Sequence, residues 1–214
     1  MAMIKIKNLS KCYGINCVFK DFNLDIEKGK ITVILGESGA GKTTLLKILL
    51  GLTDYQGEIR GEFAPVSVVM QANALIPNLT VGQNLTLVNK GMDVKTALKE
   101  AGMENAENLY PKELSAGMAR RVAILRAIYF PSKTLFLDEP FINLDLRHKY
   151  LMLEKIKEQA KANGQTVICV THDPREAVAL ADRIVVLKNR EIIYDEKNVG
   201  ENTESKLIEV LINS

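Results

Sequence analysis

The sequence contains little of what several classes of protein need. It has no tryptophan, two histidines and three cysteines among 214 residues, and the cysteines do not fall at metal-ligand spacings. The shortage of histidine excludes a metal centre built from imidazole ligands. We expect Cys12, Cys17 and Cys169 to be free thiols in a reducing compartment.

An excess of charge of one sign is also lacking. The 28 basic and 26 acidic residues are interspersed and leave a net charge of +2, so we expect no nucleic acid among the partners. No apolar run reaches the ~18 residues that are needed to cross a bilayer, and we find no positively charged leader before an apolar segment. We therefore expect a cytosolic or peripheral globular protein with no membrane span of its own.

Four continuous apolar runs, rich in β-branched residues, lie at residues 31–35, 66–70, 134–137 and 166–171. Strands of this kind are buried on both faces, which indicates a parallel sheet covered by helices. The opening stretch of the chain instead alternates apolar and polar residues, as half-buried antiparallel strands do. The sequence thus predicts an α/β fold preceded by a small antiparallel region.

Helical patterns separate and follow these runs. Residues 72–113 have no strand pattern and favour short helices, which suggests a helical insert in the α/β core. A longer helix repeats apolar residues and stops at Asn163 and Gly164, a pair typical of a helix C-cap. The helices that we expect lie at residues 42–51, 80–88, 94–102, 146–163 and 204–212.

A polar residue or motif follows each of the four apolar runs. The first run leads into Gly36, the second into Gln71, the third into Asp138 and Glu139, and the fourth into His172. Parallel α/β sheets bind their ligands at the carboxyl ends of the strands. The sequence therefore predicts a single pocket at these strand ends.

Residues 36–43, GESGAGKT, match the phosphate-binding pattern G-x-x-x-x-G-K-[ST], with a strand before it and a helix after it. Its glycines allow successive backbone N–H groups to point at phosphate. We expect Lys42 to reach the β- and γ-phosphates, the Thr43 hydroxyl to ligate Mg²⁺ and Thr44 to bond the α-phosphate. The nucleotide-binding residues predicted here are Gly36, Ser38, Gly39, Ala40, Gly41, Lys42, Thr43 and Thr44.

The third run, TLFLDEP, supplies the acidic part of such a site. Asp138 is placed at a strand end to hold Mg²⁺, and Glu139 is directed to where an attacking water would lie. Pro140 prevents the strand from continuing, which suits a site at the rim of a sheet.

Two other classes of phosphate-loop protein were weighed. DYQG at residues 54–57 matches the D-x-x-G of GTPases, but Asp54 follows a helix rather than a buried strand, so we reject that class. A kinase-type lid would need arginines that converge on phosphate. Arg120, Arg121 and Arg126 are clustered enough for such a lid, but the stretch at residues 114–118 decides against it.

LSAGM at residues 114–118 resembles the LSGGQ signature of ATP-binding cassette (ABC) proteins. The order of phosphate loop, Gln71, signature, LFLDEP, NLD at 143–145 and His172 is similar to that family, and the resemblance spans residues from about 4 to 195. KCYG resembles the family's adenine-stacking segment, with Tyr13 as the aromatic residue. Ala116 departs from the signature, and Met118 replaces its Gln as in importers of the nitrate, sulfonate and taurine group.

In this family two domains pack head to tail, and each ATP lies between one phosphate loop and the partner's signature. The resemblance implies that Ser115 and the Gly117 amide contact the γ-phosphate bound by the other subunit, while Ser115 is also a helix N-cap. It further implies that Asp145 reaches across the dimer. Gln71 would touch Mg²⁺ or the attacking water, and His172 would orient that water beside Glu139.

The resemblance implies one ABC ATP-binding domain over residues 1–214: a P-loop NTPase core with a mainly parallel sheet, an N-terminal antiparallel β-subdomain and a helical subdomain inserted at about 72–130. Its ligands would be ATP and Mg²⁺. The chain would hydrolyse ATP to ADP and phosphate and energise an ABC transporter, of bacterial importer type, by ATP-driven dimerisation with a second copy or a homologous ATPase subunit.

Transmembrane permease subunits would then hold the chain on the inner face of the cell membrane. Leu75, Ile76 and Leu79 form either the docking surface for such a permease or the small core of the insert. The alternative function is that of a soluble ABC ATPase in cofactor assembly or another role outside transport. A regulator without turnover is disfavoured because Lys42, Asp138, Glu139 and His172 are all present, although Ala116 in the signature keeps this alternative open.

Overall fold

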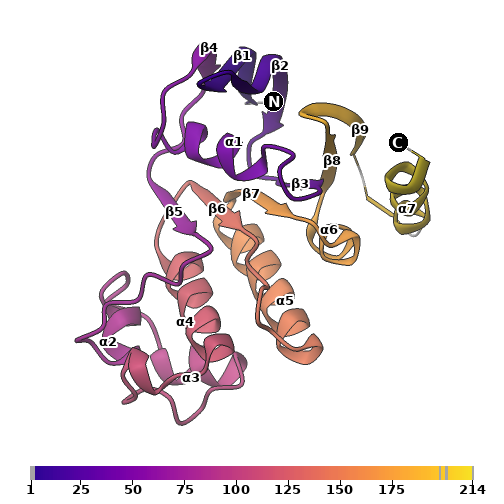
Figure 1. Ribbon diagram of the computed structural model, residues 1–214. Helices are drawn as coiled ribbons and strands as arrows, with labels where there is room; N and C mark the ends of the chain where they lie inside the picture. The colour runs from indigo at the N-terminus through magenta and orange to yellow at the C-terminus, as the bar shows by residue number, and fades with distance from the viewer. Residues whose placement is uncertain (1–2, 198, 201, 214) are drawn as a thin grey trace. The chain divides into compact units, whose positions relative to one another are not determined.

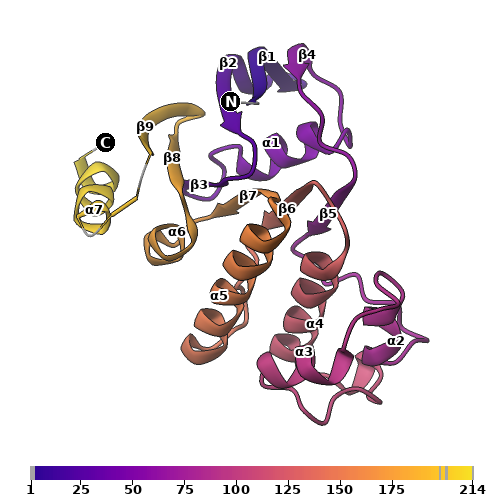
Figure 2. The same ribbon diagram turned by 180° about the vertical axis from the view of Figure 1, so that it is seen from behind.

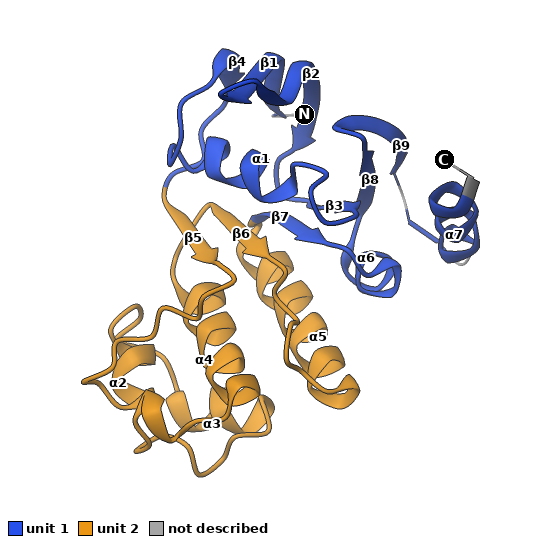
Figure 3. Cartoon of the chain, viewed as in Figure 1, with its two compact units in different colours: residues 1–64, 166–214 blue, residues 65–165 orange. Residues whose placement is uncertain are grey.

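The computed structural model describes residues 3–197, 199–200 and 202–213 (Figure 1). The chain divides into two compact units (Figure 3). The first unit comprises residues 1–64 and 166–214, and the second comprises residues 65–165.

The first unit opens with an antiparallel sheet in the order β2-β1-β4. Its strands are β1 (Met3–Tyr13), β2 (Asn16–Glu27) and β4 (Gln56–Arg60). Buried Ile4 and Ile6 alternate with the exposed Lys5 along β1, which is the pattern of a strand with one face in a core. The antiparallel start predicted from this alternation is confirmed, whereas β4 was not predicted.

A second set of strands in the same unit centres on β3 (Ile31–Gly36). Strands β7 (Thr166–Thr171) and β8 (Arg183–Lys188) flank β3 in parallel, and β9 (Glu191–Lys197) pairs with β8 in antiparallel fashion. Every residue of β3 and β7 is buried, as the continuous apolar runs predicted. The β8–β9 hairpin was not predicted.

The described residues of the first unit form three helices. They are α1 (Lys42–Leu49), α6 (Pro174–Leu180) and α7 (Thr203–Asn213). Helices α1 and α6 pack against β3, and α7 lies beside α6 in both views (Figures 1 and 2). The phosphate-binding motif therefore connects a fully buried strand to a helix that packs on it.

The second unit contains the parallel strands β5 (Val66–Val69) and β6 (Thr134–Asp138). Strand β6 is buried throughout, but Val66 of β5 is 39% exposed. The prediction of burial on both faces is thus wrong for β5. The apolar run at residues 66–70 does form a strand, but only part of that strand is buried.

Helices make up the rest of the second unit. Between β5 and β6 lie α2 (Val81–Thr86), α3 (Val94–Glu100), the 3₁₀ turn η1 (Pro111–Glu113) and α4 (Ala116–Tyr129); α5 (Leu146–Asn163) follows β6. Helix α4 packs against α2, α5 and β5. Helix α5 ends before Gly164, whose φ of 58° is the left-handed conformation expected of a C-cap glycine.

These elements confirm the predicted α/β class, with parallel strands, an N-terminal antiparallel sheet and helices inserted between β5 and β6. Among the described residues, no helix combines the length and apolar character that a membrane crossing needs.

Candidate functional site

The loop between β3 and α1 has the backbone geometry of a phosphate cradle. Gly39 and Gly41 are left-handed, with φ values of 84° and 99°. A Cβ atom on Gly41 would lie 2.8 Å from the Phe19 ring and 2.9 Å from Cγ1 of Val18, so β2 leaves no room for a side chain there. Helix α1 starts at this glycine without a side-chain cap, which leaves its positive dipole end open to an anionic ligand.

Lys42, the first residue of α1, turns its ammonium group back into this loop. The residue is 7% exposed, and its Nζ atom donates hydrogen bonds to the carbonyls of Gly36 at 2.7 Å and Glu37 at 3.0 Å. A positive charge is thereby held where the loop curls around the helix start. Thr43 and Thr44, which follow on the first turn, are half-buried.

The register of the parallel strands brings His172 to the same sheet edge as the phosphate loop. Leu35 of β3 pairs with Thr171 of β7, so Gly36 and His172 stand at neighbouring strand ends. The hydroxyl of Thr171 accepts a hydrogen bond from the Asp173 amide at 3.2 Å, which orders the chain just after His172.

Tyr13 lies at the end of β1 with 48% of its surface exposed. The Nζ atom of Lys11 stands 4.7 Å from the centroid of its ring, a distance typical of a cation–π contact. The same ammonium lies 2.7 Å from Oδ1 of Asp54, and that hydrogen bond lowers the pKa of Asp54. Asp54 therefore forms an ion pair with Lys11 of β1, which agrees with the rejection of a GTPase role.

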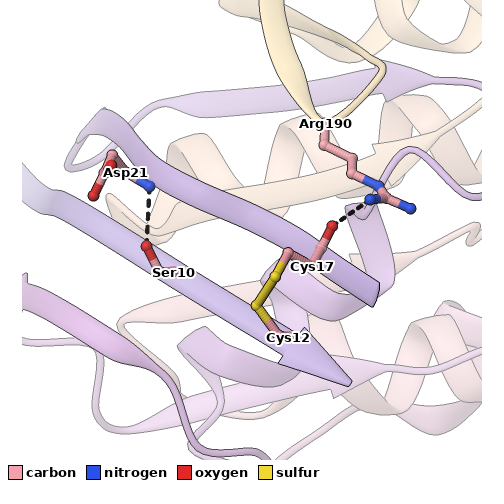
Figure 4. Close-up of a disulfide and its surroundings, with 5 residues drawn as sticks. All are labelled: Ser10, Cys12, Cys17, Asp21 and Arg190. Atoms are coloured by element: carbon pink, nitrogen blue, oxygen red, sulfur yellow. Dashed lines mark hydrogen bonds between the residues drawn. A yellow bond between two sulfur atoms is a disulfide. The ribbon is translucent and has the colours of Figure 1, made fainter. Parts of the chain in front are cut away.

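A disulfide closes the hairpin that carries Tyr13 (Figure 4). The antiparallel register sets Cys12 directly opposite Cys17, and their sulfur atoms are bonded. The expectation of three thiols is wrong for this pair and holds for Cys169, which is buried and forms no disulfide within the described part of the chain. The error arose because a separation of five residues brings two cysteines together only when a hairpin turn lies between them.

The Cys12–Cys17 hairpin is also tied to the end of β8. The Arg190 guanidinium donates a hydrogen bond to the carbonyl of Cys17 (Figure 4). A cavity of about 410 Å³ adjoins this contact, and its size is within the range of small-ligand pockets. The residues that line the cavity are Glu37, Ser38, Gly39, Ala40, Lys188, Asn189 and Arg190.

Sequence reasoning missed the last three of these residues. The available signal was a polar turn, KNRE, between two short apolar runs. Asn189 and Arg190 have φ values of 50° and 73°, as residues in a tight hairpin turn do.

In the second unit, the two acidic residues predicted for the site, Asp138 and Glu139, lie where β6 ends. Asp138 is 1% exposed and Glu139 is 8% exposed. Glu139 has a φ of 47°, in the left-handed region that residues other than glycine rarely adopt. Val69 of β5 pairs with Leu137 of β6, so the exposed Gln71 follows the neighbouring strand end.

Arg120 of α4 connects these strand ends. It is 2% exposed, and Nη2 donates to the carbonyls of Asp138 at 2.9 Å and Glu139 at 2.7 Å. Its Nη1 atom reaches the carbonyl of Gln71 at 3.4 Å. The structure thus brings Gln71, Asp138 and Glu139 together through one buried guanidinium.

The other arginines of α4 also bind backbone. Arg121 donates to the carbonyl of Ala101 at 2.6 Å, and Arg126 donates to that of Ala74 at 2.8 Å. Burial lowers the pKa of both guanidinium groups. Their hydrogen bonds within the second unit remove the basis of the kinase-type alternative.

Ser115 caps α4, as its sequence position predicted. Its Oγ atom accepts a hydrogen bond from the Met118 amide at 3.2 Å. Ala116 is the first residue of the helix and does not have a positive φ, so its methyl group is accommodated by ordinary helical backbone. A Cβ atom on Gly117 would lie 2.8 Å from the carbonyl oxygen of Asn143, so a side chain at this position would force one of the two segments to shift.

Asp145 caps α5 in the same manner. Its carboxylate accepts a hydrogen bond from the His148 amide at 3.0 Å and lies 2.6 Å from Nδ1 of the same residue. These hydrogen bonds lower the pKa of Asp145. Its side chain is 64% exposed, so it remains accessible from outside the chain.

Leu75, Ile76 and Leu79 lie in the loop before α2, and none of them is buried. Ile76 is 37% exposed. The loop is shaped by the fully buried Asn84, whose amide group donates to the carbonyls of Ile76, Leu79 and Thr80. These three apolar side chains are therefore not the core of the insert.

Comparison with known proteins agrees with this geometry. A family model described as ABC transporter matches residues 19–142. The chain is 38% identical over 205 residues to an aliphatic sulfonates import ATP-binding protein of Rhodococcus jostii, covering 91% of this chain and 82% of that protein. It is also 38% identical over 211 residues to a spermidine/putrescine import ATP-binding protein of Bacteroides thetaiotaomicron, covering 89% of this chain.

The chain spans about half of that second relative, 46% of its length. Among solved structures, it is similar to an ATP-binding cassette that was determined as a dimer in a post-hydrolysis state with ADP and Pi bound. The TM-score is 0.78 at 29% identity, and the match covers 92% of this chain and 100% of that chain.

Proposed function

Because the chain belongs to the ABC transporter family, we propose that it is the subunit that binds and hydrolyses ATP to energise an importer of bacterial type. The observation that carries the proposal is the phosphate loop. Its left-handed Gly41, the uncapped start of α1 and the inward ammonium of Lys42 together form a site for a phosphate chain.

The substrate is ATP with its Mg²⁺ ion. We assign Lys42 to the β- and γ-phosphates, Thr44 to the α-phosphate and Tyr13 to one face of the adenine. For Mg²⁺ we propose Thr43, Gln71 and Asp138, whose hydroxyl, amide and carboxylate oxygens are the ligand types that this ion prefers. The remaining contacts to phosphate would come from Gly36, Ser38, Gly39, Ala40 and Gly41.

The chemical step is the attack of water on the γ-phosphate. We assign Glu139 to the water, with Gln71 and His172 as further positioning groups. Phosphoryl transfer depends mainly on positioning and electrostatic stabilisation. The near-complete burial of Asp138 and Glu139 supports these roles, because a carboxylate held at a strand end has a defined orientation.

We further propose that a complete site needs two copies of the chain, or this chain and a homologous ATPase subunit, packed head to tail. A serine hydroxyl accepts a helix-capping hydrogen bond and still has its own proton to donate. Ser115 can therefore cap α4 and contact a partner's γ-phosphate at the same time. The exposed carboxylate of Asp145 and the Gly117 amide would act at the same interface, as the dimeric state of the similar solved structure suggests.

The remaining assignments concern the whole assembly. We propose that residues 1–214 form one ATP-binding domain with a helical subdomain at about 72–130. Leu75, Ile76 and Leu79 would dock on transmembrane permease subunits, which would hold the chain on the cytoplasmic face of the membrane. The names of the relatives support this arrangement, because both are import ATP-binding proteins.

Glu139→Gln tests the proposal directly. The variant keeps the phosphate loop, so we expect ATP to bind with unchanged affinity, while turnover falls at least about 100-fold because the attacking water loses its carboxylate. Steady-state phosphate release and size-exclusion chromatography with Mg-ATP measure the two effects. An ATP-trapped dimer of the variant is the expected species.

Glu154→Gln is the matched control, because Glu154 is an exposed carboxylate on α5 with 62% of its side chain accessible. Wild-type turnover by Glu139→Gln would refute the catalytic assignment. Co-purification with a permease supports the transport role, whereas an active ATPase dimer that recruits no membrane protein favours the soluble alternative.

A further inference from the structure

Arg120 is the most deeply buried charged side chain of the second unit that the proposed chemistry does not use. Its guanidinium donates to three consecutive carbonyls at the end of β6: Asp138 at 2.9 Å, Glu139 at 2.7 Å and Pro140 at 2.7 Å. Three successive carbonyl groups face one planar donor only where the chain turns sharply. Arg120 therefore specifies the conformation of this turn.

The turn includes a backbone conformation that is costly on its own. The left-handed φ of 47° at Glu139 is an unfavourable conformation for a residue other than glycine and persists only where the surroundings enforce it. Hydrogen bonds from a charged donor are the strongest that a carbonyl accepts. The bond from Nη2 to the Glu139 carbonyl thus holds the peptide from which the proposed catalytic carboxylate projects.

The opposite edge of the guanidinium donates hydrogen bonds to a second segment, the residues that follow β5. Nη1 donates to the carbonyls of Met70 and Gln71 and to Oδ1 of Asn73, at 3.4 Å for Gln71 and 3.3 Å for Asn73. One side chain therefore fixes Gln71 and Glu139 relative to each other, from a position on α4 just after the Ser115 cap.

We propose that Arg120 is a positioning residue for ATP hydrolysis, which makes the placement of Glu139 and Gln71 depend on the position of α4. The proposal rests on the proposed function. Arginine is required because its rigid fork presents donors along two edges, whereas the ammonium group of lysine is a compact point donor. A displacement of α4 by a partner's phosphate at Ser115 would thereby be transmitted to the catalytic carboxylate.

Arg120→Lys in the full chain tests this role. We expect kcat to fall on the order of 10- to 100-fold, as misplacement of a catalytic group by about 1 Å does. The KM for ATP should change less than about twofold, because the phosphate loop belongs to the other unit. Turnover is normalised to the nucleotide-binding sites titrated in each preparation, so that loss of folded protein does not count as loss of catalysis.

Arg121→Lys is the matched control. Arg121 is also buried on α4 and donates to backbone carbonyls, at Ala101, at Gly102 and, at 3.4 Å, at Gly117 on its own helix, but not to the turn at Glu139. We expect it to lower stability without lowering kcat per site. Equal kcat in Arg120→Lys and wild type, or equal losses in the two lysine variants, would overturn the positioning role.

Asn73→Ala provides the test if Arg120→Lys does not fold. It removes one hydrogen bond to Nη1 and leaves the arginine in place, so we expect kcat to fall two- to threefold at unchanged KM. Unchanged kcat in this variant then overturns the proposal. Absence of ATP hydrolysis in the wild-type chain is a different result, because it refutes the proposed function and this role together.

Discussion

The chain contains two helix starts suited to an anion, and they are built differently. Helix α1 begins at Gly41, whose left-handed backbone supplies no cap, and its first residue is a buried lysine. Helix α4 begins at Ser115, whose side chain already caps it, and its first residue is an exposed alanine. The first start is shaped to receive a ligand, whereas the second is complete as a helix end.

The difference shows how much of a binding site one chain can supply. At α1, loop conformation and positive charge come from contiguous residues, so we expect this helix start to bind phosphate without residues from a partner. At α4, the serine hydroxyl has one remaining proton to donate, and the helix dipole adds only a partial positive charge. We expect a site with so few donors to bind only a phosphate that is already held by other groups. The phosphate loop of a partner subunit would hold it in this way.

Gly41→Ala should break the first helix start and have the largest effect. The new Cβ atom would meet Phe19 and Val18 below 3.0 Å at a φ of 99°, which forces the loop to change. We expect ATP affinity to fall on the order of 100-fold, corresponding to about 3 kcal/mol of strain. Isothermal titration measures the affinity, and Gly164→Ala is the control, since it places alanine at a left-handed φ of 58° outside the loop.

Ser115→Asp should separate the two functions of the second helix start. Aspartate caps a helix as well as serine does, so the stability should be unchanged. It lacks the hydroxyl proton and brings negative charge toward phosphate, so we expect turnover to fall about 50-fold, somewhat less than the ~100- to 1,000-fold typical of the loss of one transition-state donor. Ser115→Thr keeps both functions and should retain activity.

A drop in thermal stability of Ser115→Asp that matched its loss of turnover would contradict this separation, because the residue would then act only as a cap. ATP binding to the monomeric variant should equal that of the wild type. Differential scanning fluorimetry and phosphate release report the two quantities on the same preparations.

Gly117→Ala should disturb the packing of the first turn of α4. The added methyl group would lie 2.8 Å from the Asn143 carbonyl oxygen, so residues 143–145 must move away from α4. We expect a loss of about 1–3 kcal/mol in the free energy of unfolding and about a tenfold loss of turnover. Ala116→Gly, which only removes an exposed methyl group, should stay within twofold; a large gain in its turnover would show that Ala116 obstructs the phosphate.

The smallest effect should come from the hairpin beside the first start. Reduction of the Cys12–Cys17 disulfide by a dithiol, or Cys12→Ser, leaves Arg190 as a tie on this hairpin but frees the turn that carries Tyr13. We expect ATP affinity to fall two- to threefold, because weakening one stacking contact costs about 0.5 kcal/mol. Tyr13→Ala should give the same loss with and without reductant; a dithiol effect that persists in Tyr13→Ala would contradict a role through this ring.

Some parts of this molecule could be predicted from the sequence alone. Contiguous residues with an unambiguous pattern predict the buried strands β3, β6 and β7, the phosphate loop and the end of α5 at Gly164. The cap at Ser115 belongs to the same class. Each depends on backbone conformation or periodicity within about one turn or strand.

Other parts were misjudged or missed. The predicted burial of Val66 is wrong, since an apolar run does not reveal whether neighbours cover the strand on both sides. The predicted free thiols at Cys12 and Cys17 are also wrong, because the hairpin register decides which residues face each other. The β8–β9 hairpin escaped notice, and Arg120 was weighed only as one of three arginines of a possible lid.

By itself, the sequence determined the α/β class, the phosphate loop and the capped start of α4, because each follows from local backbone preferences and from residues that are neighbours in the chain. Only the tertiary structure decided the bond between Cys12 and Cys17, the lack of room for a side chain at Gly117 and the partners of Arg120. Those features depend on atoms that folding brings within about 3 Å of each other from residues that are not neighbours in the chain. No local pattern specifies such distances.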